Sequence, residues 1–384
     1  MDAAFRRTGS TALALLALMA LPAAVHAKIF VTSKTADTLD GACNADCSLR
    51  EAIVAANATP GHDTVVVLPG VYTLTRGGVN EDLGATGDLD VNSTDGLLVV
   101  GAGPAFTAID GAGIDRVFDV RGTLDLLSVT VLNGAAVGTN SGGGAIQSIN
   151  GRVTVGYSVL RGNSTTGFGF GGAIFADGIQ SSVTVRYSTI ADNTAQGGGG
   201  GITAGNEISV IDSTISGNRS VQDFGGGVYL FSEAQAFFNN VTIAGNTASQ
   251  RGGGVYVETP TFLGTPRFGN TILAGNSATQ DDDCFGVTIS GGYNLVGDAA
   301  GCPGFGAATF DRTGTTASPL DARLAPLGFY GGQTPTQALL VGSPAINAGN
   351  PDPPGPGACE RTDQRLRPRP SGGRCDIGAF ERKQ

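Results

Sequence analysis

The sequence predicts an all-β fold: a single right-handed parallel β-helix with a short N-terminal capping helix and an irregular C-terminal cap. The first observation behind this prediction is a glycine-rich motif that occurs five times between residues 143 and 276. Each copy ends in a branched residue, and these residues follow one another at spacings of 28, 28, 26 and 27. They are Ile146, Ile174, Ile202, Val228 and Val255. A fixed period of this length is typical of a solenoid.

The second observation is the content of each repeat, which suits short strands and leaves no room for a helix. Runs such as 153–155 and 183–185 alternate β-branched residues with a period of two. Helical repeats need about ten or more residues of helical pattern, and consecutive glycines disfavour that. The spaced leucines of leucine-rich repeats are also missing. Successive coils of a parallel β-helix stack at about 4.7–4.9 Å, and its crossovers are strongly right-handed.

Equivalent positions of the repeats predict columns of stacked side chains inside the coils. Two columns are apolar: Val155, Val185, Val210, Phe238 and Phe268, and Leu160, Ile190, Ile215, Ile243 and Leu273. A third column is a ladder of asparagines: Asn163, Asn193, Asn218, Asn246 and Asn276. Asparagine tolerates the left-handed conformation, and its amide hydrogen-bonds to the coils on either side. We therefore expect these asparagines to be structural rather than functional.

Residues 1–27 are predicted to be a cleaved signal peptide. Arg6 and Arg7 precede an apolar run over residues 12–21, and small residues allow cleavage near Ala27. The run is too short to span a bilayer, and the rest of the chain has no second apolar segment. The alternative is a buried N-terminal helix. The prediction places the protein outside the cytoplasm, as a secreted, cell-surface or periplasmic protein.

The charge of the mature chain excludes several classes of partner. Without Asp2, Arg6 and Arg7 the chain keeps 21 basic and 32 acidic residues, a net charge of −11. Such a surface does not bind nucleic acid or an anionic membrane by charge. No transmembrane segment is expected in the mature chain, and we expect a soluble monomer.

Six cysteines fall into three pairs that are close in sequence. The pairs are Cys43 and Cys47, Cys284 and Cys302, and Cys359 and Cys375. In an exported protein this pattern predicts three local disulfides. A zinc site is the competing interpretation, but the pairs are far apart and the single mature histidine, His62, lies near only the first.

Residues 28–60 are expected to form a first strand and a short amphipathic helix. Ser48 and Glu51 make a capping box, in which each side chain bonds to the other residue's backbone N–H. Leu49, Ile53 and Ala56 then form one apolar face. We expect this helix to close the first coil, whose core and strand edge would otherwise meet water.

Residues 61–318 are expected to form the β-helix itself, with irregular early coils before the clear repeats at 143–276. In the early coils Asp88 and Asp90 alternate along one strand, and Asp95 follows closely. Oxygen ligands of this kind bind calcium, so these three aspartates are calcium candidates. Solvated strand residues are the competing interpretation. No other cofactor is expected.

Residues 319–384 are expected to form a C-terminal cap, because the segment is rich in proline and loses the repeat. The pair Cys359 and Cys375 would hold it together. Phe380 is one of the apolar residues that we expect to close the second open end of the solenoid.

Three stretches of the chain resemble known families. Residues 47–52, Cys-Ser-Leu-Arg-Glu-Ala, look like the signature of secreted bacterial CSLREA-domain proteins. Residues 343–349 and 375–381 resemble the choice-of-anchor Q domain. The repeats are similar to right-handed parallel β-helix repeats of the pectate-lyase-like superfamily and, more loosely, to those of chlamydial polymorphic membrane proteins. The resemblance implies a β-helix and export, and it brings no catalytic residues.

The sequence favours a non-catalytic extracellular module over an enzyme. Among the exposed acids no carboxylate cluster is recognised at matching positions of neighbouring repeats, so no catalytic residue is assigned. Instead, one column is expected to face outward and to suit a polysaccharide or cell-surface glycan: Tyr157, Tyr187, Asp212, Asn240 and Asn270. The predicted function is therefore an adhesin, a glycan-binding module or a structural exoprotein. The alternative is a polysaccharide lyase or glycoside hydrolase of the pectate-lyase-like superfamily.

Overall fold

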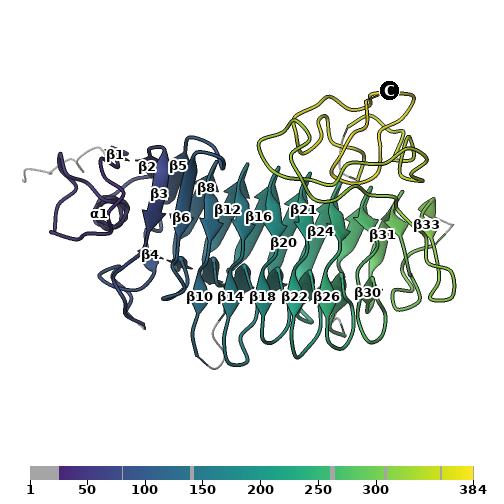
Figure 1. Cartoon of the computed structure of the whole chain (residues 1–384), viewed down its shortest axis with the longest axis horizontal. Coiled ribbons are helices and arrows are strands. Elements are labelled where there is room, and N and C mark those ends of the chain that lie inside the picture. Colours follow the sequence, from purple (N-terminus) through teal and green to yellow (C-terminus); the bar gives the residue numbers. More distant parts are fainter. Residues whose placement is uncertain are drawn as a thin grey trace, which may run out of the picture.

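The structure, a computed structural model, describes residues 26–79, 81–138, 142–259, 264–306, 309–354 and 357–383. These residues form an elongated parallel β-helix with a short helix at its N-terminal end (Figure 1). The predicted fold class is confirmed. All but the last two residues of the expected signal peptide lie outside the described residues. Among the described residues, no helix is long and apolar enough to cross a membrane.

Two ten-stranded parallel sheets run the length of the solenoid. Sheet A contains, in spatial order, β1 (Ile29–Val31), β2 (Asp63–Val67), β5 (Leu97–Gly101), β8 (Thr123–Leu127), β12 (Arg152–Gly156), β16 (Ser182–Arg186), β20 (Glu207–Ile211), β24 (Gln235–Asn239), β28 (Arg267–Gly269) and β31 (Ile289–Gly292). Sheet B contains β3 (Gly70–Thr73), β6 (Thr107–Asp110), β9 (Thr130–Leu132), β13 (Val159–Arg161), β17 (Thr189–Ala191), β21 (Thr214–Ser216), β25 (Thr242–Ala244), β29 (Ile272–Leu273), β32 (Leu295–Val296) and β33 (Arg312–Thr313).

Two further parallel sheets complete the coils. Sheet C contains β4 (Leu89–Val91), β7 (Phe118–Val120), β11 (Ile146–Ile149), β15 (Ile174–Asp177), β19 (Ile202–Ala204), β23 (Val228–Leu230), β27 (Val255–Val257) and β30 (Cys284–Phe285). Sheet D contains β10 (Ala135–Ala136), β14 (Ser164–Thr165), β18 (Thr194–Ala195), β22 (Arg219–Ser220) and β26 (Thr247–Ala248). Within one repeat the chain therefore passes through sheets C, A, B and D in turn.

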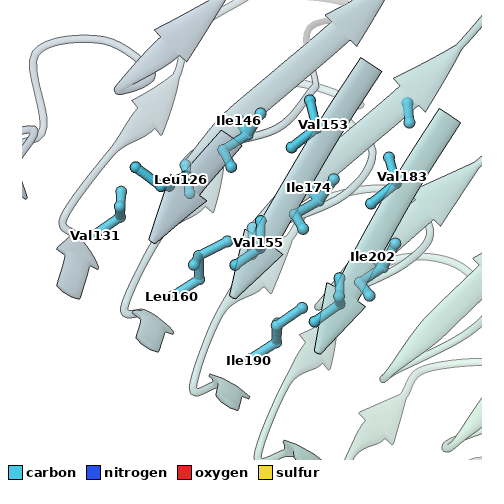
Figure 2. Packing of buried hydrophobic residues seen from close by; sticks show 14 of the residues in the cluster. Leu126, Val131, Ile146, Val153, Val155, Leu160, Ile174, Val183, Ile190 and Ile202 are labelled. Carbon is cyan, nitrogen blue, oxygen red and sulfur yellow. The ribbon is translucent and has the colours of Figure 1, made fainter. Parts of the chain in front are cut away.

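The predicted apolar columns are confirmed, and they fill the inside of the coils. In sheet A, Val155 lies in register with Val185, and the column continues to Phe238 and Phe268. The rings of Phe238 and Phe268 stack at 4.6 Å. In sheet B the column through Leu160 and its neighbours is equally continuous. Figure 2 shows Val155, Leu160 and Ile190 of these columns together with Ile146, Ile174 and Ile202 of sheet C inside the solenoid.

The five asparagines stack at the corner that follows sheet B, and each is bonded to the next coil. The Oδ1 of Asn218 accepts both the backbone N–H of Asn193 (3.1 Å) and its side-chain N–H (2.9 Å). The Nδ2 of Asn218 donates to the carbonyl of Ile190 at 2.9 Å. The left-handed residue at this corner is the one before the asparagine, such as Gly217 (φ 70°), and not the asparagine itself. The expectation that asparagine supplies that conformation here is wrong.

The ladder ends on an aspartate. Asp283 accepts the backbone and side-chain N–H groups of Asn276 through Oδ1, at 3.0 and 2.9 Å. Its Oδ2 accepts the N–H of Asp298 at 2.7 Å. A carboxylate accepts hydrogen bonds and donates none, which suits the last position of a ladder whose members all donate in one direction.

The titration of Asp283 gives a testable pH dependence. Burial raises the pKa of Asp283 to about 6, although the N–H donors of Asn276 and Asp298 oppose the shift. The folded state therefore holds the proton to higher pH than the unfolded state. Asp283 therefore stabilises the folded state below about pH 4. This contribution to the free energy of unfolding falls by up to ~3 kcal/mol as the pH rises to about 6.

Asp283→Asn should remove this dependence. We expect the free energy of unfolding of the variant, relative to the parent, to be lower at pH 4 and higher at pH 7. Denaturant unfolding at both pH values measures this difference, and the other acids cancel in the comparison. Parallel pH curves for the two proteins would contradict the assignment.

The N-terminal helix, α1 (Leu49–Asn57), packs against the first coils as expected from the sequence (Figure 1). The Oγ of Ser48 accepts the N–H of Glu51 at 3.1 Å, and the Glu51 carboxylate accepts the N–H of Ser48 at 2.7 Å. Leu49, Ile53 and Ala56 are buried in the main core. The helix thus covers the apolar residues that the first coil would otherwise expose.

The C-terminal segment does not close the end of the solenoid, and this expectation is wrong. It lies along the flank, over the corner of sheets A and B (Figure 1, yellow). Gln364, for example, accepts from Thr214 at 2.6 Å and donates to Thr189 at 3.0 Å. Phe380 packs in a second apolar cluster with solenoid residues such as Ile272 and Leu295. We call residues 319–383 the flank segment.

The C-terminal end of the core is closed instead by the insertion after β32. Phe305 lies edge-on against the ring of Phe268 at 5.6 Å, and Cys302 is buried in the same cluster. A disulfide joins Cys302 to Cys284. The other two disulfides join Cys43 to Cys47 and Cys359 to Cys375, so the predicted local pairing is confirmed.

Candidate functional site

The outward face of sheet C carries the candidate site. Side chains alternate along a strand, so the second residue of each short strand of sheet C points away from the core. The parallel register places these residues in one column. From the N-terminal coil onward they are Asp90, Asp119, Gln147, Phe175, Thr203, Tyr229, Tyr256 and Phe285. The column therefore begins with two carboxylates and ends with aromatic rings.

Aromatic rings gather around the C-terminal half of this column, and we call them the aromatic ridge. Its members are Phe168, Phe170, Phe224, Tyr229, Phe231, Tyr256 and Phe285. The ring of Tyr256 stacks on Tyr229 at 5.1 Å and on Phe285 at 5.2 Å. Phe168 is 43% exposed, and Tyr256 and Phe285 are half-buried. Contiguous, partly exposed aromatic surface of this kind marks an interaction site.

A row of glutamines runs beside the ridge, on the turns that lead into sheet C. The row consists of Gln196, Gln222, Gln250 and Gln280. The Nε2 of Gln250 donates to the carbonyl of Gln222 at 2.9 Å. Arg251 donates to the Oε1 of Gln280 at 2.8 Å, and its guanidinium lies 4.7 Å from the centre of the Phe285 ring. The amide row and the ridge therefore form one surface.

The surroundings of the ridge are acidic. Glu258 accepts a hydrogen bond from the hydroxyl of Tyr229, and Asp223 and Asp281 lie on the same turns as the glutamines. Burial, together with the Glu258 carboxylate, raises the pKa of Tyr229 above its usual range. Burial likewise raises the pKa of Tyr256. Both phenols therefore stay neutral, and the carboxylates disfavour a polyanionic ligand.

At the other end of the column three aspartates converge. One oxygen each of Asp82, Asp90 and Asp119 lie within 4.8 Å of one another. Asp82 comes from the turn before β4, Asp90 from β4 and Asp119 from β7. Burial raises the pKa of Asp90 to about 7; the Asp119 carboxylate contributes to this shift, and the hydrogen bond from the Gly84 N–H opposes it. We call these three residues the aspartate cluster.

The aspartate cluster differs from the calcium candidates predicted from the sequence. Asp90 belongs to it, but Asp88 and Asp95 do not. The Asp88 carboxylate lies 3.2 Å from Arg116, and burial raises its pKa to about 8. Asp95 is exposed and accepts the N–H of Gly61 at 2.9 Å.

The expectation that no carboxylates meet at matching positions of neighbouring coils is wrong, because Asp90 and Asp119 are in register. A signal for this pair exists in the sequence: Leu-Asp-Val at 89–91 and Phe-Asp-Val at 118–120 have the same pattern one repeat apart. Asp82 lies in an irregular turn, and no pattern in the sequence indicates it.

The column expected to face outward is largely covered. Tyr157 and Tyr187 stack on each other at 5.0 Å. Asp212, Asn240 and Asn270 are fully buried beneath the flank segment, where the Oδ1 of Asn240 accepts the N–H of Glu360 at 2.9 Å. All five have positive φ, between 43° and 53°. This column is a corner of the coil that holds the flank segment, and it is not a ligand surface.

The whole structure is similar to the crystal structure of pectate lyase Pel9A. The TM-score is 0.50 at 16% sequence identity, with 94% of this chain and 98% of the other covered. The likeness establishes the architecture, a parallel β-helix of the pectate-lyase type. No protein-family model matches the chain, and no curated protein matches it in sequence. The resemblance of the terminal motifs to CSLREA-domain and choice-of-anchor Q proteins therefore stays a prediction.

Proposed function

We propose that the protein is an exported, non-catalytic module that binds a polysaccharide or cell-surface glycan along the outward face of sheet C. The observation that carries this proposal is the aromatic ridge with the glutamine row beside it. Sugar rings present apolar C–H faces and hydroxyl groups, which suit aromatic side chains and amides respectively. Stacked coils repeat these groups along the solenoid axis, so the surface suits a ligand that is itself a repeating chain.

The charge of the surface favours a neutral glycan over an anionic one as the ligand. Glu258, Asp223 and Asp281 lie around the ridge, where Arg251 pairs with Asp281 at 3.6 Å, and the whole chain is acidic. A uronate polymer would bring further carboxylates to this region, where like charges repel. A neutral polysaccharide meets no such penalty. The proposed ligand therefore differs in charge from pectate, after which the similar lyase is named.

Export is supported by the disulfides and by the expected leader. Three disulfides join all six cysteines, and such bonds persist in oxidising compartments outside the cytoplasm. We propose that the protein acts there as a monomer, because sheets A and B are covered in part by the flank segment and the first coil is covered by α1.

The alternative function is a polysaccharide lyase, and the aspartate cluster is the observation that favours it. Carboxylates on stacked strands beside Arg116 and Arg121 offer cation-binding and basic groups together. However, Asp90 is fully buried and Asp119 is 4% exposed. The preceding turn lies against Asp90, where the backbone N–H of Gly84 donates to its carboxylate. A polymer chain does not reach the carboxylates of Asp90 and Asp119, so binding without cleavage is the better-supported function.

Binding to polysaccharides tests this proposal. We expect the purified chain to bind a neutral polymer such as a β-glucan or xylan, and Tyr256→Ala to weaken that binding by roughly tenfold. Gln250→Ala, an exposed change that leaves the stacked rings in place, should weaken it less. Phe106→Ala is the control, because Phe106 is 67% exposed and lies away from the ridge.

Two outcomes would overturn the proposal. Equal losses for Tyr256→Ala and Phe106→Ala would show that the ridge is not the binding surface. Release of unsaturated uronate from polygalacturonate, followed by its ultraviolet absorbance, would establish the lyase alternative instead.

A further inference from the structure

We propose that Asp82, Asp90 and Asp119 form a binding site for a calcium-class divalent cation, which fastens the turn at residues 81–88 to β4 and β7. The first support is geometry. Two oxygens bound to one calcium ion at about 2.3–2.6 Å are at most roughly 5 Å apart. The three ligand atoms lie within 4.8 Å of one another, which is inside this limit for oxygens that share one ion.

The second support is a set of buried oxygens without a donor. The Oδ2 of Asp90 accepts the N–H of Gly84 at 2.7 Å, but its Oδ1 has no hydrogen-bond partner among the described residues. The Oδ1 of Asp119 also has none there. Asp90 is fully buried and Asp119 nearly so. Carboxylate oxygens buried without a donor are costly, and a bound cation supplies the missing partner.

The third support is the balance of charge around the site. The acidic groups that face it are Glu81, Asp82, Asp88, Asp90, Asp115 and Asp119. The basic groups are Arg116, which lies 3.7 Å from Asp119, and Arg121, which lies 2.7 Å from Asp82 and 3.4 Å from Asp119. Two guanidinium groups leave this region with an excess of negative charge. A bound divalent cation would reduce this excess of negative charge.

The ligand chemistry selects the type of cation. All three side chains offer oxygen, and neither histidine nor cysteine belongs to the group, so a hard cation is favoured over zinc. Magnesium prefers near-ideal octahedral geometry at about 2.0–2.1 Å, which holds its ligands closer together. Magnesium is usually bound through one or two carboxylates and keeps several waters, whereas three carboxylates from a turn and two strands suit the flexible coordination of calcium. This site is separate from the aromatic ridge and does not depend on the proposed glycan binding.

The position of the cluster gives the cation a structural role. On its other side the same turn is held by Arg50, which donates to the carbonyls of Gly84, Gly87 and Asp88. A cation at the cluster would therefore couple helix α1, the turn and the first two strands of sheet C. Arg121, whose side chain is 45% exposed, competes with the cation for Asp82 and Asp119.

Calcium titration of the chelator-treated chain tests the inference. We expect saturable binding of one calcium ion by calorimetry, and a rise of roughly 3 °C or more in the unfolding midpoint at saturation. Asp90→Asn and Asp119→Asn should abolish both responses. Asp82→Asn should weaken binding without a folding defect, because the Asp82 side chain is 55% exposed. Asp95→Asn is the matched control and should respond like the parent chain.

The variant Arg121→Gln tests whether this arginine competes with the cation for Asp82 and Asp119. If the arginine competes with the ion, this variant should bind calcium more tightly than the parent. The inference is overturned if millimolar calcium neither binds nor shifts the midpoint, or if Asp95→Asn loses the response as fully as Asp82→Asn. The first result would mean that the cluster holds no calcium ion, and the second that the calcium response does not come from the cluster. Neither result bears on glycan binding at the ridge.

Discussion

Arg50→Ala should destabilise the N-terminal third of the molecule by about 3–5 kcal/mol, the usual range for breaking a buried ion pair. Arg50 is 1% exposed, and its guanidinium pairs with Asp37 at 2.6 Å. It also donates to three backbone carbonyls of the turn at residues 84–88. Removal of the side chain leaves the Asp37 carboxylate without its main partner and three carbonyls without a donor, while α1 loses its link to that turn.

Denaturant unfolding of Arg50→Ala and Arg50→Lys measures this effect. Lysine keeps the charge but lacks the planar fork that reaches Asp37 and the carbonyls together, so most of the loss should remain. Arg152→Ala is the control, since Arg152 is exposed on sheet A. A loss below about 1 kcal/mol for Arg50→Ala would show that the turn is held by other contacts.

Arg50 also shows where reasoning from the sequence stops. The capping box of Ser48 and Glu51 is a local pattern, and the structure contains it as the spacing indicates. The same stretch gives no sign that Arg50 is buried, because its partner Asp37 lies 13 residues earlier in an irregular segment. A sequence motif defines local geometry, whereas a long-range partner without periodicity has no pattern to reveal it.

The repeats are the opposite case. A column such as Val155, Val185 and Val210 is predictable because each coil places the same residue type at the same register. The position of the flank segment is not predictable in this way. Its residues contact coils more than 100 positions earlier, as when Ala379 donates to Thr242, and they follow no period. For this reason the sequence indicates a capping element but does not indicate the face that it covers.

The aspartate cluster and the aromatic ridge lie between these two cases. Residues 90 and 119, and residues 229 and 256, match one another across the repeats, so their stacking follows from the period. The contributions of Asp82 and of the ring of Phe168 come from turns of variable length. The residue types that stack in a column can thus be predicted from the sequence. The residues that the turns add to a site are seen only in the structure.

Asn218→Ala should have the second large effect, a loss of about 2–6 kcal/mol in the free energy of unfolding, because two buried donors lose their acceptor at about 1–3 kcal/mol each. Asn218 is fully buried in the middle of the ladder. Its Oδ1 accepts the backbone and side-chain N–H groups of Asn193, which have no other acceptor in the ladder. The carbonyl of Ile190 and the Oδ1 of Asn246 also lose a donor.

Two comparisons separate the ladder from its surroundings. Gln222→Ala removes an exposed amide on the turn that follows β22, and it should stay within about 0.5 kcal/mol of the parent chain. Asn218→Asp keeps the acceptor for Asn193, but its second oxygen faces the carbonyl of Ile190 and the Oδ1 of Asn246, which are both acceptors. A protonated acid donates there and an ionised one does not, so the loss should be smaller than that of Asn218→Ala at low pH and should grow as the acid ionises. If Asn218→Ala and Gln222→Ala are equally mild, the ladder is not a main source of stability, and the apolar columns hold the coils together without it.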